Sequence, residues 1–262
     1  MEKRNGTRTN TDEHRLDLLD EVRKKKEFSG LPNSVVGRAL RESKDDVKEA
    51  RALLRKYFGV FLTNRVLRFV RTQDTGHRTQ EILKFHISSK KRDYGEFYGE
   101  IFSRIKNVKS VVDLGCGANG FSYEFLPEGV SYVGIEAAGQ LVDQMNVFFK
   151  DNDFDGRSIC GDLFDLDFVV EILKKAKRDR VVFLFQVVDA LENMERNFSL
   201  KLISEIMKNC EVLVLSLPLV SLGGGKKFAV KRKWLMDFLV EDYNVERDFE
   251  MFGERILIVQ KK

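Results

Sequence analysis

The sequence contains few cysteines and no long apolar run. Only Cys116, Cys160 and Cys210 occur in 262 residues, and their odd number and spacing match neither a zinc site nor a disulfide framework. We therefore expect reduced thiols and no metal. No segment approaches the roughly 18 to 20 uncharged apolar residues that span a bilayer, and the first residues lack the apolar centre of a secretory signal. These absences predict a soluble globular protein of the cytoplasm without a membrane partner.

Residues for nucleophilic or general-base chemistry are also scarce. Cys116 has no adjacent histidine or cation to activate its thiol, so we interpret it as a small residue that lines a turn. The three histidines, His14, His77 and His86, all lie in the N-terminal third of the chain. We assign them no chemistry.

Charge is distributed unevenly along the chain. Residues 1–92 contain 23 Lys and Arg against 13 Asp and Glu, a net charge of +10, whereas residues 93–262 contain 22 against 28, a net charge of −6. Basic segments bind phosphate backbones and release counterions, which makes nucleic acid a natural partner. A well-solvated helical surface explains the same composition, and charge alone does not separate the two interpretations.

The N-terminal third has helical periodicity from residue 12 to residue 86. Residues 46–62 place apolar side chains at three-four spacing, and Ser43 with Asp46 predicts a capping box before them. Residues 14–28 and 34–42 predict two further helices. The front of the chain is therefore expected to be a small helical bundle.

From Ser110 onward, short β-branched runs alternate with longer helical segments, which predicts a doubly wound α/β sheet. Helices are expected at 141–151, 200–210 and 233–243. A three-residue link between the last two strands requires antiparallel pairing, because a parallel crossover needs a dozen residues or more. The predicted strands are 110–115, 131–136, 157–162, 180–186, 211–218, 244–251 and 255–261.

A glycine-rich turn follows the first predicted strand, in the stretch VVDLGCGANG. Gly115, Gly117 and Gly120 form G-x-G-x-x-G, which lets backbone N–H groups approach a ligand. The motif alone serves either the pyrophosphate of a dinucleotide or the amino-acid end of S-adenosylmethionine. Asp113, two residues before Gly115, suits an ammonium group and would repel a pyrophosphate. The turn therefore favours S-adenosylmethionine.

Acidic residues end the next two predicted strands. Glu136 lies 21 residues beyond Gly115, where an acid can accept both ribose hydroxyls in sites for NAD or S-adenosylmethionine. Asp162 can accept the adenine amino group, and the backbone of Leu163 can contact the ring. Each acid alone is more often a helix cap or a loop residue. The ordered set at one sheet edge is a stronger signal for a nucleoside site.

Several stretches together resemble the 16S ribosomal RNA guanine-N7 methyltransferases of the aminoglycoside-resistance type. They are HISSKKRDYGEFYGEIF, VVDLGCGANG, LFQVVDALE and LPLVSLGGGKK, and the similarity runs from about residue 15 to residue 240. Seven strands ending in a hairpin also describe the class I methyltransferase sheet better than a dehydrogenase sheet. The resemblance implies a helical domain at 1–92 that binds the small ribosomal subunit through 16S ribosomal RNA, and we expect the protein to be a monomer. The resemblance also implies a class I, Rossmann-like cofactor domain at 93–262.

By this resemblance Arg92 would bind the methionine carboxylate of S-adenosyl-L-methionine, and Gln186 and Ser221 would position the target base. The implied cofactor residues are Arg92, Asp113, Gly115, Cys116, Gly117, Asn119, Glu136, Asp162, Leu163 and Gln186. The implied RNA-binding residues are Lys24, Lys25, Lys26, Arg55, Lys56, Lys90, Lys91, Lys226 and Lys227.

The expected chemistry needs no general base, because guanine N7 carries an in-plane lone pair and no proton. The chain departs from the family, which usually has Pro, Lys and Arg where this sequence has Gly120, Gln186 and Gly225. Because of these departures, the target nucleotide stays open. The choice between a housekeeping role and a resistance role stays open too. The remaining alternatives are a methyltransferase of another RNA or of a protein, an NAD-dependent oxidoreductase, and a non-catalytic ribosome-binding protein.

Overall fold

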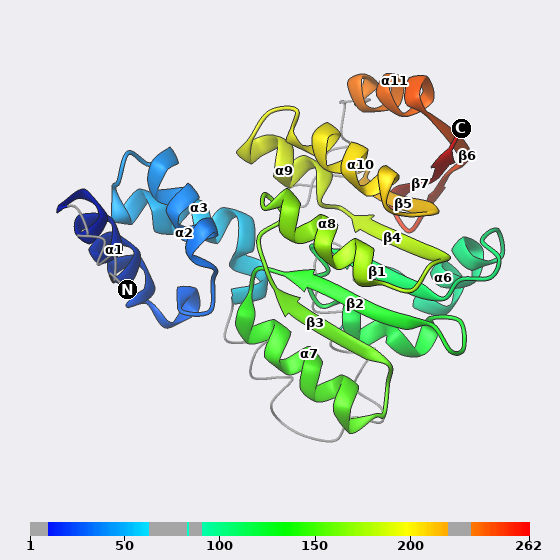
Figure 1. Cartoon of the computed structure of the whole chain (residues 1–262), viewed down its shortest axis with the longest axis horizontal. Helices are drawn as coiled ribbons and strands as arrows, with labels where there is room; N and C mark the ends of the chain where they lie inside the picture. Colours follow the sequence, from blue (N-terminus) through cyan, green and yellow to red (C-terminus); the bar gives the residue numbers. More distant parts are fainter. Residues whose placement is uncertain (1–9, 63–82, 84–90, 220–231) are drawn as a thin grey trace, which may run out of the picture.

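The computed structural model describes residues 10–62, 83, 91–219 and 232–262. Its N-terminal part is helical, as predicted, and lies beside a larger α/β part (Figure 1). The N-terminal elements are α1 (Asn10–Arg23), the short 3₁₀ helix η1 (Lys26–Phe28), α2 (Asn33–Glu42) and α3 (Val47–Leu62).

The link between α2 and α3 differs from the predicted capping box. Asp46 caps α3, because its Oδ1 accepts the Glu49 N–H at 2.8 Å. Ser43 instead ends α2, and its hydroxyl donates to the Leu40 carbonyl at 3.1 Å. Two residues between them, Lys44 and Asp45, have left-handed backbones with φ of 52° and 65°. This reversal of the chain keeps Ser43 out of the next helix, so the Ser43–Asp46 capping box was wrong.

The α/β part contains one seven-stranded sheet with the order β3-β2-β1-β4-β5-β7-β6. Strands β1 to β5 are parallel, and β7 pairs antiparallel with both β5 and β6, which confirms the predicted terminal hairpin. The order reverses between β1 and β4, where open α/β sheets bind ligands. The strands are β1 (Ser110–Leu114), β2 (Ser131–Glu136), β3 (Gly156–Cys160), β4 (Arg180–Phe185), β5 (Val212–Pro218), β6 (Tyr243–Met251) and β7 (Glu254–Lys261).

Successive strand residues point to opposite faces of the sheet. Helices cover both of these faces. Val111 packs in the apolar cluster that contains α6 (Tyr94–Phe102) and α7 (Gly139–Asp151). Val112 belongs to the other cluster, which also contains residues of α8 (Leu166–Lys175), α10 (Phe198–Lys208) and α11 (Lys233–Asp242). In the described part of the chain, no helix has both the length and the apolar character of a membrane span. The remaining helices are α9 (Val188–Met194) and the 3₁₀ helix η2 (Asn119–Phe125).

The N-terminal helices lie at the carboxyl edge of the sheet, toward which the arrows of β2 and β3 point (Figure 1). The Gly139 N–H, at the start of α7, donates to the Gly30 carbonyl at 3.1 Å. A Cβ on Gly139 would lie 2.6 Å from that oxygen, so glycine permits the contact. The Tyr57 hydroxyl donates to the Asn193 carbonyl of α9 at 3.4 Å. The helical segment therefore covers the edge where the acids end their strands; the domain boundary at residue 92 stays a prediction.

Candidate functional site

The glycine turn has the backbone geometry that its sequence predicts. Gly115 and Gly117 adopt left-handed conformations, with φ of 69° and 53°. A Cβ on Gly115 would lie 2.8 Å from the Val187 side chain, so the close approach of the ends of β1 and β4 also requires glycine. Gly120 is needed for a different reason, because a Cβ there would lie 2.8 Å from the sulfur of Met145 on α7. The third glycine lets the segment after the turn pack on that helix.

Asp113, the penultimate residue of β1, has one carboxylate oxygen without a hydrogen bond to the described residues. Its Oδ2 accepts hydrogen bonds from the Asn119 amide at 2.6 Å and from the Tyr132 hydroxyl at 2.9 Å. Its Oδ1 is buried and has no hydrogen-bond partner within the described residues. Burial raises the pKa of Asp113 to about 6. A buried carboxylate oxygen without a partner fits a cationic ligand group, because pairing would remove this cost.

Glu136 links the end of β2 to the glycine turn. Its Oε2 accepts the Gly117 N–H at 3.0 Å, and its Oε1 accepts the Ala138 N–H at 2.9 Å. The side chain is buried, and burial raises its pKa although both backbone bonds oppose this shift. Each carboxylate oxygen can accept more than one hydrogen bond, so both keep acceptor capacity for a pair of hydroxyls.

Asp162 follows β3, so the three predicted acids lie at the carboxyl ends of three adjacent strands. Its Oδ1 accepts the Phe164 N–H at 3.0 Å, and its Oδ2 faces the Arg38 guanidinium at 3.9 Å. The Leu163 side chain approaches Gly115, where its Cδ1 would lie 3.5 Å from an added Cβ. The structure thus brings the predicted adenine residues next to the glycine turn.

Arg92 forms a buried ion pair that the sequence did not reveal. Its Nε and Nη2 bind the two Glu254 oxygens at 2.7 and 2.6 Å, and Nη2 also contacts the Ser216 hydroxyl at 3.4 Å. Burial opposes the charge on Arg92, but Glu254 outweighs it and raises the pKa of Arg92. Burial likewise opposes the charge on Glu254, but Arg92 keeps the pKa of Glu254 below its ordinary value. The Gln186 side chain also bonds Glu254, and its backbone is left-handed with φ of 59°.

Glu254 reaches this network through strand register. Antiparallel pairing of β7 with β5 sets Glu254 opposite Pro218, beside the carboxyl ends of β4 and β5. No local motif around Glu254 carries this information, because the pairing joins residues 36 positions apart along the chain. Sequence reasoning could have found Glu254 only by predicting that register.

Two further predicted residues have defined surroundings. The Asn119 amide nitrogen is committed to Asp113 and to the Tyr98 hydroxyl, at 2.6 and 2.9 Å, so Asn119 orients the acid. Its direct contact with a cofactor stays a prediction. Burial raises the pKa of the Cys116 thiol well above its ordinary value, which keeps the thiol protonated and agrees with a non-nucleophilic role.

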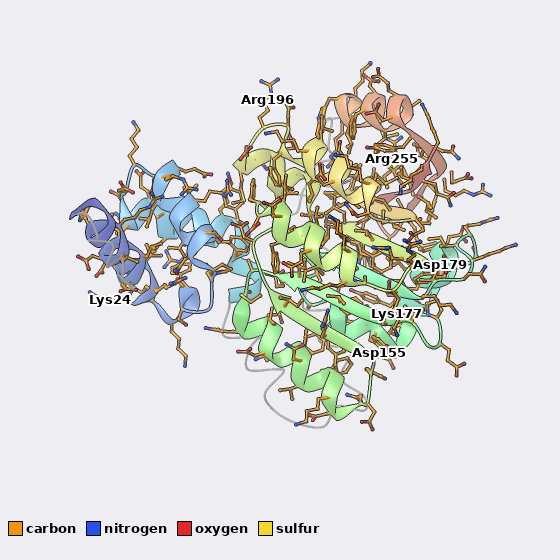
Figure 2. The ribbon with its side chains drawn as sticks, in the orientation of Figure 1. Lys24, Asp155, Lys177, Asp179, Arg196 and Arg255 are labelled. Carbon is orange, nitrogen blue, oxygen red and sulfur yellow. The ribbon has the colours of Figure 1, made fainter. Side chains whose placement is uncertain are left out.

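The predicted RNA-binding residues are only partly described. Lys24 pairs with Glu21 and Arg55 pairs with Glu27, which weakens their net positive field. Figure 2 shows Lys24 on the N-terminal helices, far from Asp155 and Asp179 at the other end of the molecule. Lys25, Lys26, Lys56 and Lys91 are exposed and make no ion pair with any described residue. Lys90, Lys226, Lys227, Ser221 and Gly225 lie outside the described residues.

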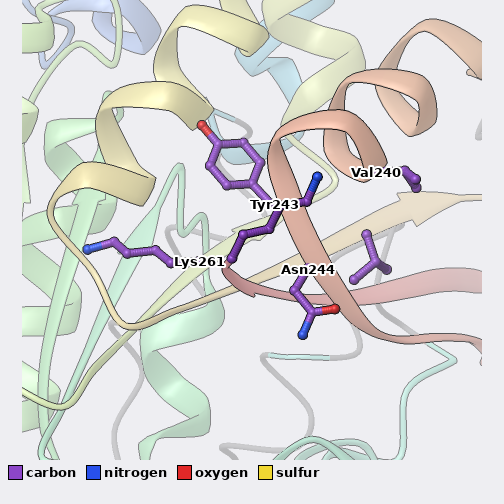
Figure 3. Close-up of a pocket in the computed structure, with 6 residues that line it drawn as sticks. Val240, Tyr243, Asn244 and Lys261 are labelled. Atoms are coloured by element: carbon purple, nitrogen blue, oxygen red, sulfur yellow. The ribbon is translucent and has the colours of Figure 1, made fainter.

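A surface depression lies away from this site, between α11 and the ends of β6 and β7 (Figure 3). Tyr243 and Lys261 line it, and Lys261 follows the β7 residue that pairs with the start of β5. It therefore lies at the edge of the sheet opposite Gly115, and we assign it no function. No group of three metal-ligating side chains occurs among the described residues.

The architecture is that of class I methyltransferases: a seven-stranded sheet with a terminal antiparallel hairpin, and a glycine turn after β1. It is similar to an rRNA methylase from Escherichia coli, with 22% sequence identity over 95% of this chain and 100% of that chain, and a TM-score of 0.78. The 16S rRNA methyltransferase RmtF, solved with S-adenosyl-L-homocysteine, gives 20% identity over 96% and 99%, with a TM-score of 0.78.

The 16S rRNA methylase ArmA covers less of the chain, 76%, with 18% identity over 97% of its own length and a TM-score of 0.58. No family model matches the sequence, and no curated protein matches it. At these identities the solved structures establish the fold, and the class I methyltransferase fold predicted from the sequence is confirmed.

Proposed function

We propose that this protein is an S-adenosylmethionine-dependent methyltransferase that modifies ribosomal RNA of the small subunit at guanine N7 in the decoding region, as a monomer. One observation carries the proposal: the buried Asp113 Oδ1 has no partner among the described residues and lies beside the glycine turn. Glu136 and Asp162 then follow at the next two strand ends. A ligand with an ammonium group, a ribose and an adenine matches these three acids in order.

The residues present fit S-adenosylmethionine better than NAD. Asp113 would accept the ammonium group, Glu136 the ribose hydroxyls, and Asp162 the adenine amino group. Glu254 occupies Nε and Nη2 of Arg92, so a methionine carboxylate would use the remaining Nη1. A pyrophosphate beside Asp113 would meet a buried acid, and the guanidinium of Arg92, which also acts on Asp113, is already paired with Glu254.

The chain would catalyse methyl transfer by positioning alone. When bound, S-adenosylmethionine supplies an electrophilic methyl group on a sulfonium. Guanine N7 would form a bond to this methyl carbon through its in-plane lone pair as the sulfur–methyl bond breaks, which would release S-adenosylhomocysteine. N7 carries no proton to lose, so no side chain needs to act as a base. Gln186 lies at the end of β4, and its bond to Glu254 restrains its amide. Gln186 would help to orient the incoming base.

Ribosomal RNA is the proposed substrate for two reasons. The solved structures that share the fold over nearly the whole chain include an rRNA methylase and the 16S rRNA methyltransferase RmtF. The N-terminal third also carries a net charge of +10, which favours an RNA backbone over a protein substrate. A base in a duplex usually has to leave the stack to be methylated. We expect it to enter at the carboxyl edge of the sheet, beside the N-terminal helices.

The test is transfer of a tritiated methyl group to purified small ribosomal subunits, free 16S ribosomal RNA, transfer RNA and ribosomal proteins. We expect incorporation into small subunits and chain cleavage at 7-methylguanosine after borohydride and aniline treatment. Incorporation only into transfer RNA or protein would move the proposal to another substrate. Binding of NAD without binding of S-adenosylmethionine in calorimetry would refute it.

A further inference from the structure

Arg38 of α2 reaches from the N-terminal helices to the tip of β3. Its guanidinium carbon lies 3.7 Å from the centre of the Phe164 ring. Its Nη2 lies 3.9 Å from Asp162 Oδ2, and its Nη1 lies 3.5 Å from Glu195 Oε2. The side chain is 19% exposed, so it is held at an interface and does not extend into solvent.

The hydrogen-bonding capacity of Arg38 is only partly used. The Nε is buried and has no partner within the part of the chain that the structure describes. The two contacts with acids are at or beyond the usual limit of a hydrogen bond. Arg38 is therefore placed by stacking and charge, and it keeps donors for a further acceptor.

The Asp162 carboxylate has a different neighbour at each of its two oxygens. The Phe164 N–H holds Oδ1 at 3.0 Å, and the Phe164 ring stacks on Phe198 with centroids 4.1 Å apart. Oδ2 faces Arg38 at 3.9 Å and is the oxygen that remains for an adenine amino group. Arg38 also contacts both Asp162 and Glu195, so its removal would take away a positive charge that these two carboxylates share, although Glu195 keeps Lys201 as a partner.

We propose that Arg38 is a positioning residue of the cofactor site, which holds the Asp162 carboxylate toward the adenine, so that the N-terminal helices complete the site. This inference rests on the proposed function. Gly30 supports it independently, because the same N-terminal segment accepts the N–H of Gly139 three residues after Glu136. The segment that carries the basic charge thus contacts the tips of both nucleoside-binding strands.

The test compares S-adenosylhomocysteine with its analogue that lacks the 6-amino group, by calorimetry on the full chain. The wild type should prefer the amino ligand by about 10- to 150-fold, the range expected for a hydrogen bond to a charged acceptor. Arg38→Met should lower this ratio to about threefold or less, because Asp162 loses its second restraint. Arg38→Lys should keep an intermediate ratio. Arg41→Met, an exposed arginine on the same helix, should bind both ligands as the wild type does.

A second variant separates positioning from folding. Adding Glu195→Gln to Arg38→Met removes the repulsion with Asp162 and should recover part of the ratio. Equal weakening of both ligands by Arg38→Met, with an unchanged ratio, would mean a structural role only and would overturn the inference. An unchanged affinity and ratio would overturn it too. Failure of the wild type to bind S-adenosylhomocysteine would instead refute the proposed function, and the inference with it.

Discussion

The two arginines at the carboxyl edge differ in how the fold holds them. Arg92 is 3% exposed and donates two hydrogen bonds, of 2.7 and 2.6 Å, to Glu254. Both residues belong to the α/β part and the segment that flanks it. Arg38 is 19% exposed, comes from the N-terminal helices, and approaches Asp162 only to 3.9 Å. The proposed amino-acid end of the candidate site therefore depends on sheet register, and the proposed adenine end depends on docking of a second segment. The proposed amino-acid end should therefore tolerate substitution less than the proposed adenine end.

The largest expected effect is at the Arg92–Glu254 pair, in the proposed amino-acid end of the site. Glu254→Gln would leave the Arg92 charge buried without its partner, which typically costs about 3 to 5 kcal/mol. We expect a loss of that size in the free energy of unfolding, measured by urea denaturation. The neighbouring pair of Arg255 with Asp248 is a matched control, since it is also bidentate but is 29% and 39% exposed.

Asp248→Asn should cost less than about 1 kcal/mol, because solvent screens an exposed pair. Figure 2 shows Arg255 at the outer end of the sheet, away from the N-terminal helices. Equal losses for Glu254→Gln and Asp248→Asn would contradict the distinction between a buried and an exposed pair.

Asp113→Asn should affect stability and binding in opposite directions. Because the pKa of Asp113 rises from 3.8 to about 6 on folding, the native state holds its proton longer than the unfolded state. Stability of the ligand-free protein should therefore fall as pH rises from about 3 to 7, by about 3 kcal/mol in total. Asp113→Asn should remove this decline and weaken S-adenosylhomocysteine at pH 8. Parallel stability curves of wild type and variant would exclude the shifted pKa.

Glu136→Ala should weaken the cofactor by about 1 to 3 kcal/mol, because hydrogen bonds to a carboxylate are removed. Calorimetry with S-adenosylhomocysteine measures this change. Glu128→Ala, at an exposed acid in the loop before β2, serves as control and should bind normally. An unchanged affinity of Glu136→Ala would exclude a contact between Glu136 and the ribose. Glu136 would then serve only to connect the Gly117 and Ala138 amides.

The smallest effect on the cofactor is expected from charge reversal in the N-terminal helices. Lys24, Lys25 and Lys26 changed to Glu should weaken RNA binding and reduce its salt slope by about 0.9 for each phosphate that the protein no longer neutralises. Cofactor affinity should stay unchanged. Reversal of Lys174 and Lys175, exposed on α8, is the control. An unaltered slope in the N-terminal variant would favour the solvated-surface interpretation.

Much of the fold followed from local pattern. The strand from 131 to 136 was predicted to the residue, and the short link after Met251 predicted the antiparallel hairpin, whose turn has left-handed Phe252 and Gly253. Strand alternation and helical spacing are local properties, so a single sequence reveals them. Ser43 was misassigned because the reversal at Lys44 and Asp45 has no such periodic signature.

The sequence by itself determined the sheet, the glycine turn and the acids at three strand ends, because each depends on residues close along the chain. Only the tertiary structure decided the partners of these groups. Strand pairing set Glu254 on Arg92, and docking of α2 set Arg38 beside Asp162 across more than a hundred residues. Long-range contacts arise from packing of whole elements, and no local pattern encodes which charges such packing brings together.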